Sequence, residues 1–375
     1  MRVIIEQTVF DEVGETSALP LLEFFALASD ERHTLLTKPL YSEDETGQPL
    51  ARWLARFPKP LKKLCESVLM QGQDRASTEP PDTAQCRVVA RGPSDWKRSR
   101  LCIADALRLL RTPLRLLLEN RRNDYEFLLR LAPPARREEL QQAVADGWIE
   151  IAQGGGLGEI KKLLKELITA PAGDLRARVE RLRLWVMFDR DSDPEDRSEP
   201  SPTSKETAAL CGKSQTETGD PWSLPFVQLS RRSVENYIPI RLLERWADRG
   251  SGRERDGRRK RVAALARLTP TARWQYNMKH GLLGDVSGSI RREIQKEKNS
   301  RELIDGDLDP LFRGLSREDR RLLTTGFGAD IASLFHAPLG IAEASREHWF
   351  LEEYQRGPST QPDRAAILEG VFARL

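Results

Sequence analysis

The sequence predicts an α/β protein built on a central, mainly parallel sheet. Between about residues 101 and 285, short apolar runs alternate with amphipathic helical segments, and this alternation is typical of parallel sheets. Hydrophobic residues make up 39% of the 375 residues, which is enough for a sizeable core. The longest apolar stretch near the start, residues 21–28, is too short to cross a bilayer, so we expect no membrane association.

Composition divides the chain into three expected regions. Residues 1–100 combine a possible strand at Val3–Ile5 with apolar helical pieces and a polar stretch at 71–85 that is typical of a loop. We therefore expect an N-terminal α+β region with an interaction or regulatory role. Residues 101–285 form the α/β domain, in which 194–221 is a polar insertion with one short helix near 205–210. Residues 286–375 predict a helical C-terminal region.

Four apolar runs supply the strands expected in the α/β domain. Each ends at a polar or glycine-rich turn, as buried parallel strands do. Asn123, with Glu126 three positions later, predicts a capped helix after the first run. The runs are Leu114–Leu118, Trp148–Ala152, Leu182–Phe188 and Phe226–Leu229.

Charge and cysteine content narrow the class of protein. Lys and Arg total 60 against 57 Asp and Glu, so the net charge of +3 does not by itself indicate a nucleic-acid-binding protein. The four cysteines are widely spaced and form no metal-binding or disulfide pattern. With no secretory signal at the start, we expect reduced thiols and a cytoplasmic protein.

Carboxylates follow the first and third strands of this domain. Glu119 ends the first run, and Asp189 and Asp191 follow the third. The carboxyl ends of parallel strands share one edge of the sheet, so Glu119 and Asp189 should meet there. Asp189 and Asp191 are two residues apart, and in an extended chain this spacing places both side chains on the same side. Converging carboxylates repel one another unless a cation lies between them, and oxygen ligands suit Mg²⁺ or Mn²⁺. The pattern predicts a site for one or two divalent metal ions.

The order of these features resembles the TOPRIM fold. A strand ends in Glu119, a second precedes Gly154, Gly155 and Gly156, a third ends in Asp189-x-Asp191, and Glu235-Asn236-Tyr237 follows later. In particular, about residues 101–285 look like the overcoming-lysogenization-defect (OLD) nucleases and their bacterial antiphage relatives. The resemblance implies a TOPRIM-like catalytic domain that binds divalent cations and acts on phosphodiester bonds.

The resemblance also implies roles for individual residues. Glu119 would ligate metal or handle a proton, Asp189 and Asp191 would ligate metal, and Asp193 is an outer candidate. Lys279, in Asn277-Met278-Lys279-His280-Gly281, would stabilise the transition state. A solvated lysine is the alternative for Lys279, and a structural role is the alternative for Glu235.

Basic residues provide candidate contacts to nucleic acid. Arg231 and Arg232, after the fourth strand, could hold flanking phosphates. The densest basic run could follow a nucleic-acid backbone, although a solvated helix face is the alternative. The residues of that run assigned to nucleic acid are Arg253, Arg258, Arg259, Lys260 and Arg261.

The leading hypothesis is a metal-dependent endonuclease that acts on DNA or RNA as the effector of a bacterial antiphage system. Because the sequence has no ATP-binding motif, we expect a separate ATPase or sensor protein as partner, and a homodimer formed through the terminal regions. One alternative is a TOPRIM enzyme of primer synthesis or RNA maturation. The other is a non-catalytic nucleic-acid-binding or scaffold subunit.

Overall fold

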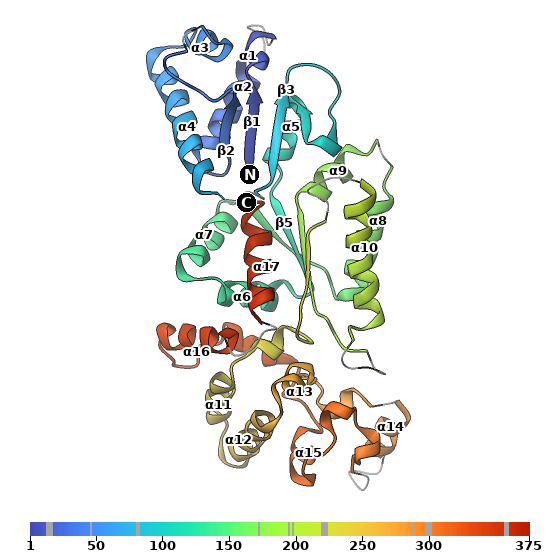
Figure 1. Ribbon diagram of the computed structural model, residues 1–375. Helices are drawn as coiled ribbons and strands as arrows, with labels where there is room; N and C mark the ends of the chain where they lie inside the picture. Colours follow the sequence, from blue (N-terminus) through green and yellow to red (C-terminus); the bar gives the residue numbers. More distant parts are fainter. Residues whose placement is uncertain are drawn as a thin grey trace.

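The computed structural model describes residues 1–12, 18–45, 47–79, 83–171, 173–193, 196, 199–218, 224–286, 288–296, 302–355 and 360–375. Within these residues the strands form two separate four-stranded sheets, and all neighbouring strands run parallel. The prediction of an α/β protein is therefore confirmed. The first sheet, the second sheet and a group of C-terminal helices follow one another along the molecule (Figure 1).

The first sheet contradicts the expected α+β arrangement, because its strand order β2-β1-β3-β4 is wholly parallel. Of these strands the sequence predicts only β1, because the others are short and include polar or charged residues. Helix α4 also continues to Thr78, through much of the stretch predicted as a loop. The elements are β1 (Arg2–Glu6), α1 (Thr8–Glu12), α2 (Ala18–Ser29), β2 (Thr34–Lys38), α3 (Pro49–Leu54), α4 (Lys59–Thr78), β3 (Gln85–Val89), a 3₁₀ helix η2 (Trp96–Arg98), β4 (Arg100–Cys102) and α5 (Ile103–Arg111).

The second sheet has the order β6-β5-β7-β8, and its strands coincide with the four predicted runs within two residues at each end. All five residues of β7 are buried, as expected for a strand covered on both faces. The elements are β5 (Leu114–Leu118), α6 (Arg121–Leu131), α7 (Pro134–Ala145), β6 (Ile149–Gln153), α8 (Leu157–Thr169), α9 (Leu175–Leu182), β7 (Leu184–Phe188), α10 (Pro202–Thr218) and β8 (Phe226–Gln228).

Two local predictions in this region are wrong. The cap of α6 is Asn120, whose side chain accepts the N–H of Asn123 at 3.0 Å. The polar insertion contains the 17-residue helix α10 rather than a short helical piece. Helix α10 lies beside α8, where Lys161 and Glu206 form an ion pair of 2.8 Å (Figure 1). Several residues of the insertion, including 194–195 and 219–221, lie outside the described residues.

Residues after β8 are helical, as expected, and cover the carboxyl edge of the second sheet (Figure 1). The last helix returns onto that sheet, where a Cβ added to Gly370 would lie 2.5 Å from the Trp185 ring nitrogen. One continuous apolar core therefore joins the sheet and these helices. The elements are η3 (Val234–Tyr237), α11 (Ile240–Asp248), α12 (Gly252–Arg267), α13 (Pro270–Gln275), η4 (Leu282–Gly284), α14 (Gly288–Lys296), η5 (Asp305–Asp307), η6 (Pro310–Phe312), α15 (Arg317–Leu323), η7 (Ala329–Phe335), α16 (Glu343–Gln355) and α17 (Thr360–Phe372).

None of the helices in the described part of the chain combines the length and the apolar composition needed to span a membrane. The four cysteines carry free thiols, and three of them are buried.

Candidate functional site

The structure brings Glu119 and Asp189 together at the carboxyl edge of the second sheet. Glu119 directly follows β5 and Asp189 directly follows β7, and these strands are neighbours. The backbone N–H of Asp189 donates to Glu119 Oε1 at 2.9 Å, and the N–H of Val234 donates to Asp189 Oδ1 at 3.2 Å. The edge therefore collects carboxylates from elements far apart in the sequence.

Asp191 lies beside this pair, but not for the reason that the sequence suggested. Its φ of 47° is left-handed, so the Asp-x-Asp segment is not extended and the alternation argument was wrong. The chain turns at Asp191, whose N–H donates to the Arg232 carbonyl at 2.8 Å. Asp193 follows in the next loop, where its N–H donates to the Glu199 carbonyl at 3.0 Å. Asp193 is not among the main charges that act on Glu119, Asp189 or Asp191.

A further carboxylate at this edge, Asp124, was not predicted from the sequence. It lies in the first turn of α6, is 5% exposed and accepts the N–H of Asn120 at 2.9 Å. An acidic residue in a first helical turn commonly stabilises the helix, so the sequence gave no reason to single it out. Its position one turn after Glu119 was the available signal.

Burial and mutual repulsion disfavour the ionised forms of these carboxyl groups. Burial raises the pKa of Glu119 to about 7, with the charges of Asp191 and Asp124 adding to the effect. Burial likewise raises the pKa of Asp124 to about 7 and that of Asp189 well above its usual value. The pKa of Asp191 is raised too, chiefly by burial. Glu119 and Asp124, with pKa values of about 7, can exchange protons near neutral pH.

Lys279 is a cation at this site, and it binds Glu235. The Lys279 Nζ lies 3.0 Å from Glu235 Oε1, while Glu235 is 2% exposed and its Oε2 has no hydrogen-bond partner among the described residues. Burial acts to lower the pKa of Lys279, but the charges of Glu235 and the neighbouring carboxylates outweigh it and raise the pKa to about 12. Lys279 is therefore protonated at neutral pH and attracts anions.

A close backbone crossing fixes the segment that carries Lys279. The N–H of Phe327 donates to the Met278 carbonyl at 2.7 Å. A Cβ added to Gly326 would lie 2.4 Å from the carbonyl carbon of Lys279, and one added to Gly281 would lie 2.4 Å from that of Thr325. Only glycine fits at these two positions without displacing backbone atoms. The C-terminal region thus positions a lysine at the edge of the sheet.

The glycine run lies beside the end of β5. Gly154 donates its N–H to the Leu118 carbonyl, and a Cβ there would lie 2.3 Å from the Ile160 side chain. Gly155 and Gly156 have φ values of 75° and 103° and lead directly into α8. The run allows a tight turn next to Glu119 and contributes no charged group.

The carboxylates have the right chemistry for a divalent cation but do not form a closed ligand set. Hard oxygen donors suit Mg²⁺ or Mn²⁺, and the unsatisfied Glu235 Oε2 is an available donor. Yet across the described ranges, no three His, Cys, Asp or Glu side chains are grouped so as to hold a metal ion. Glu119 and Asp189 each use one oxygen to accept a backbone N–H. Side-chain rotation is needed before several of them can share a cation.

The assignment of Arg231 to nucleic acid is wrong. Its side chain is 0% exposed, pairs with Glu353 at 2.9 Å and lies over the rings of Tyr237 and Trp274 at 4.6 and 5.1 Å. A guanidinium so enclosed cannot reach a phosphate. Arg231 instead holds α16 against the segment that follows β8.

Arg232 and Arg261 are also committed to internal contacts. Arg232 forms a two-pronged ion pair with Asp285 at 2.7 and 2.8 Å. Arg261 donates to the carbonyls of Leu322 and Gly326 at 3.1 and 3.0 Å, at the end of α15. The guanidinium groups of Arg232 and Arg261 thus bind mainly to partners within the C-terminal region.

The other basic residues lie on the outer part of helix α12. Arg253 and Lys260 are exposed, and Arg259 is exposed but pairs with Asp248 at 2.7 Å. Arg258 is half-buried over the Trp246 ring, 4.3 Å from its centre. This helix offers a small basic surface rather than the full run that the sequence suggested.

Comparison of the chain with protein-family models, with curated proteins and with solved structures finds no match.

Proposed function

We propose that this chain is a divalent-metal-dependent endonuclease with a TOPRIM-type core that hydrolyses phosphodiester bonds of DNA or RNA. The observation that supports the proposal is the gathering of buried carboxylates and one lysine at the carboxyl edge of a parallel sheet. Ligands of open α/β sheets bind at this edge. Carboxylates without a counter-charge at this edge destabilise the fold. Their presence is explained if they bind a ligand.

Each residue has a distinct role in this proposal. Glu119, Asp189 and Asp191 would hold Mg²⁺ or Mn²⁺, with Asp193 as an outer candidate. When bound, the metal ions would activate water and stabilise the leaving oxygen. Alternatively, Glu119 would handle a proton rather than hold metal, because its pKa of about 7 without metal suits proton exchange at neutral pH. Lys279 would neutralise the charge that develops on the phosphoryl oxygens.

We further propose that the enzyme acts in the cytoplasm as an antiphage effector, licensed by a separate ATPase or sensor protein. The lack of an ATP-binding motif in the sequence supports a separate partner. The region of the first sheet, which contains none of the carboxylates of the site, is available for docking or for homodimer formation. The exposed residues of α12 would contact the nucleic-acid backbone.

Cleavage of a panel of nucleic acids tests this function. The purified protein is incubated with plasmid DNA, single-stranded DNA, tRNA or total RNA, in Mg²⁺, Mn²⁺ or EDTA, and compared with Glu119→Ala and Asp189→Ala. We expect metal-dependent cutting that both variants lose. Cutting that persists in both variants would refute the assignment. If the wild type is silent even after genetically neighbouring proteins are added, a non-catalytic role replaces it.

A further inference from the structure

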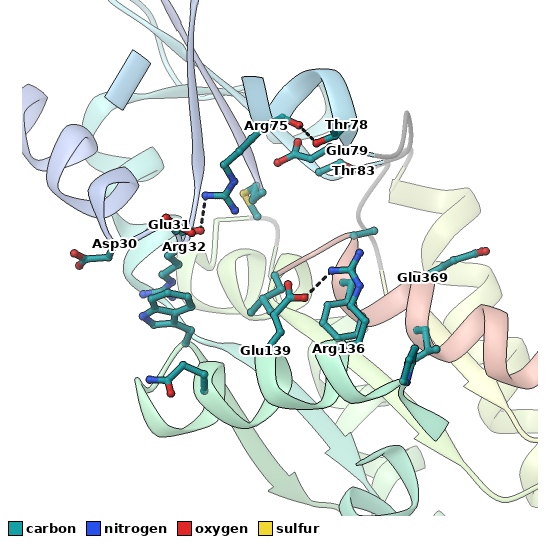
Figure 2. Close-up of a pocket in the computed structure, with 18 residues that line it drawn as sticks. Asp30, Glu31, Arg32, Arg75, Thr78, Glu79, Thr83, Arg136, Glu139 and Glu369 are labelled. Atoms are coloured by element: carbon teal, nitrogen blue, oxygen red, sulfur yellow. Dashed lines mark hydrogen bonds and ion pairs between the residues drawn. The ribbon is translucent and has the colours of Figure 1, made fainter. Parts of the chain in front are cut away.

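A cavity of about 930 Å³ lies between the regions of the two sheets (Figure 2), and Glu119 and Asp189 are not among the residues that line it. It is lined at the amino ends of strands: Met1 precedes β1 and Trp148 precedes β6. Phe372 and Leu375, at the end of the chain, close another side. Glu119 and Asp189 lie at the opposite edge of the second sheet, so this cavity is separate from the candidate nuclease site.

Two guanidinium groups meet at one wall of this cavity without a counter-charge. Arg32 Nη2 and Arg183 Nε donate to the same oxygen, the Thr112 carbonyl, at 2.9 and 3.0 Å. Arg32 lines the cavity, and Arg183 is 1% exposed. Neither forms an ion pair with any residue that the structure describes, and Arg32 Nε and Arg183 Nη2 have no hydrogen-bond partner there. Two like charges this close, one buried and one half-buried, destabilise the protein unless an anion accompanies them.

Arg75 adds a third positive charge to the lining. Its guanidinium donates to a backbone carbonyl, that of Glu31, at 2.8 Å, so no carboxylate neutralises it among the described residues. The half-buried carboxylate of the lining, Glu79, is already paired with Arg2 at 2.6 Å. Asp30 and Glu369 are exposed and point outward (Figure 2). Counting Glu31 and Glu139, five carboxylates and three arginines line the cavity, so an anion is favoured only at the inner wall, where Arg32 lies beside Arg183.

The remaining lining suits a planar group. Trp148 and Phe372 are half-buried, and the Arg136 guanidinium lies 4.6 Å from the centre of the Phe372 ring while pairing with Glu139 at 2.7 Å. Cavities of this volume accommodate ligands of nucleotide size. Aromatic side chains bind bases by stacking.

We propose that this cavity binds a small phosphate-bearing molecule of nucleotide size, with its phosphates at Arg32 and Arg75 and its planar group beside Trp148. This inference is independent of the proposed nuclease function. It assigns a ligand to a region that contains none of the site carboxylates.

Isothermal titration calorimetry in EDTA tests the proposal, because EDTA prevents metal-bridged binding at the carboxylates. The full chain is titrated with ATP and, separately, with adenosine. We expect ATP to bind and adenosine to bind at least tenfold more weakly. Arg75→Ala and Arg32→Gln should each weaken ATP binding at least tenfold. Titration with tripolyphosphate measures how much of the affinity comes from the phosphate groups. We expect tripolyphosphate to bind more weakly than ATP does, because it lacks the planar group.

Two control variants keep the result specific. Arg98→Ala removes an arginine that is 79% exposed and is not part of the cavity lining, and Asp189→Asn alters the candidate nuclease site; both should bind ATP like the wild type. Arg75→Ala removes a single hydrogen bond, to the backbone carbonyl of Glu31. This variant should therefore fold even if Arg32→Gln does not. Absence of ATP binding at about 1 mM, equal affinity for adenosine and ATP, or unchanged binding by folded Arg75→Ala would each overturn the proposal.

Discussion

The two sheets of this protein share one topology and differ in the chemistry at their edges. In each, the first strand along the chain lies between the second and the third, and the fourth lies outermost. At the carboxyl edge of the first sheet, Glu6 lies 3.5 Å from Arg100. At the carboxyl edge of the second sheet, Glu119, Asp189 and other carboxylates lie near a single lysine, Lys279. The same strand topology therefore carries different side-chain chemistry at its two carboxyl edges. The side chains at the edge, and not the topology, indicate function.

The sheets also differ in how closely helices approach them. A Cβ added to Gly72 on α4 would lie 2.1 Å from the backbone oxygen of Leu35 in β2, so that helix covers the edge of the first sheet at backbone contact. At the second sheet, a Cβ added to Gly154, in the turn between β6 and α8, would meet the Ile160 side chain first, with the backbone oxygen of Leu118 farther away at 3.1 Å. A side chain can rotate away, whereas a strand cannot.

The largest difference between the sheets should appear in catalysis. Asp189→Asn removes one carboxylate charge at the second edge, and we expect metal-dependent cleavage to fall about 10³-fold or more. The matched change at the first edge, Glu6→Gln, should alter the rate less than about twofold. Both are measured as initial rates on the substrate that the wild type cuts. Equal losses in the two variants would remove the functional distinction between the edges.

The lysine of the second edge should matter next. Lys279→Ala removes the cation beside Glu235, and we expect cleavage to fall about 10²-fold, because charge on the phosphoryl oxygens is no longer neutralised. Lys205→Ala, on α10, removes a surface lysine that pairs with Glu199 and serves as the control. If both variants cut like the wild type, Lys279 is a solvated lysine with no catalytic role.

Alanine substitutions at Gly72 and Gly154 should lower the free energy of unfolding by different amounts in the two sheets. We expect Gly72→Ala to lower the free energy of unfolding by about 2 kcal/mol or more, because the added methyl group meets backbone. Gly154→Ala should cost less, about 1 kcal/mol, because the nearest atoms belong to the Ile160 side chain and the backbone oxygen of Leu118 lies farther away, at 3.1 Å. Urea unfolding measures both. A larger loss at Gly154 would show that the turn beside β5 is the more rigid of the two.

The smallest expected effect concerns the pH dependence of stability without metal. The pKa of Glu119 and that of Asp124 are raised to about 7 in the folded protein, from the usual 4.5 and 3.8. The folded state thus binds more protons than the unfolded state between these values, and stability falls as pH rises through that window. In EDTA, we expect the wild type to lose a few degrees more in Tm between pH 5 and pH 8 than Glu119→Gln does.

Added Mg²⁺ or Mn²⁺ should reverse this loss at pH 8 in the wild type, because a bound cation offsets the repulsion. The first edge provides the control, since Glu6→Gln should keep the wild-type pH dependence. An unchanged pH dependence in Glu119→Gln would show that the carboxylates are better solvated than their burial indicates.

Sequence alone predicted the second sheet far better than the first. The strands of the second sheet are continuous apolar runs, because both of their faces are covered, and such runs are visible without tertiary information. In the first sheet, β3 contains Arg87 and β4 has three residues, so neither produces a clear pattern. The insertion after β7 was similarly misjudged, since packing on α8 makes a helix of a polar segment.

The sequence by itself determined that Glu119 and Asp189 stand at the ends of buried strands, because parallel strands place their carboxyl ends at one edge. Only the tertiary structure decided which other groups join them. Asp124 enters through a helix turn, and Lys279 through a backbone crossing with Gly326, a contact between distant segments. Burial separated Arg231, enclosed in the core, from the exposed Arg253, although the two residue types are identical. Sequence specifies residue type and order, whereas exposure and partners arise only when distant segments pack.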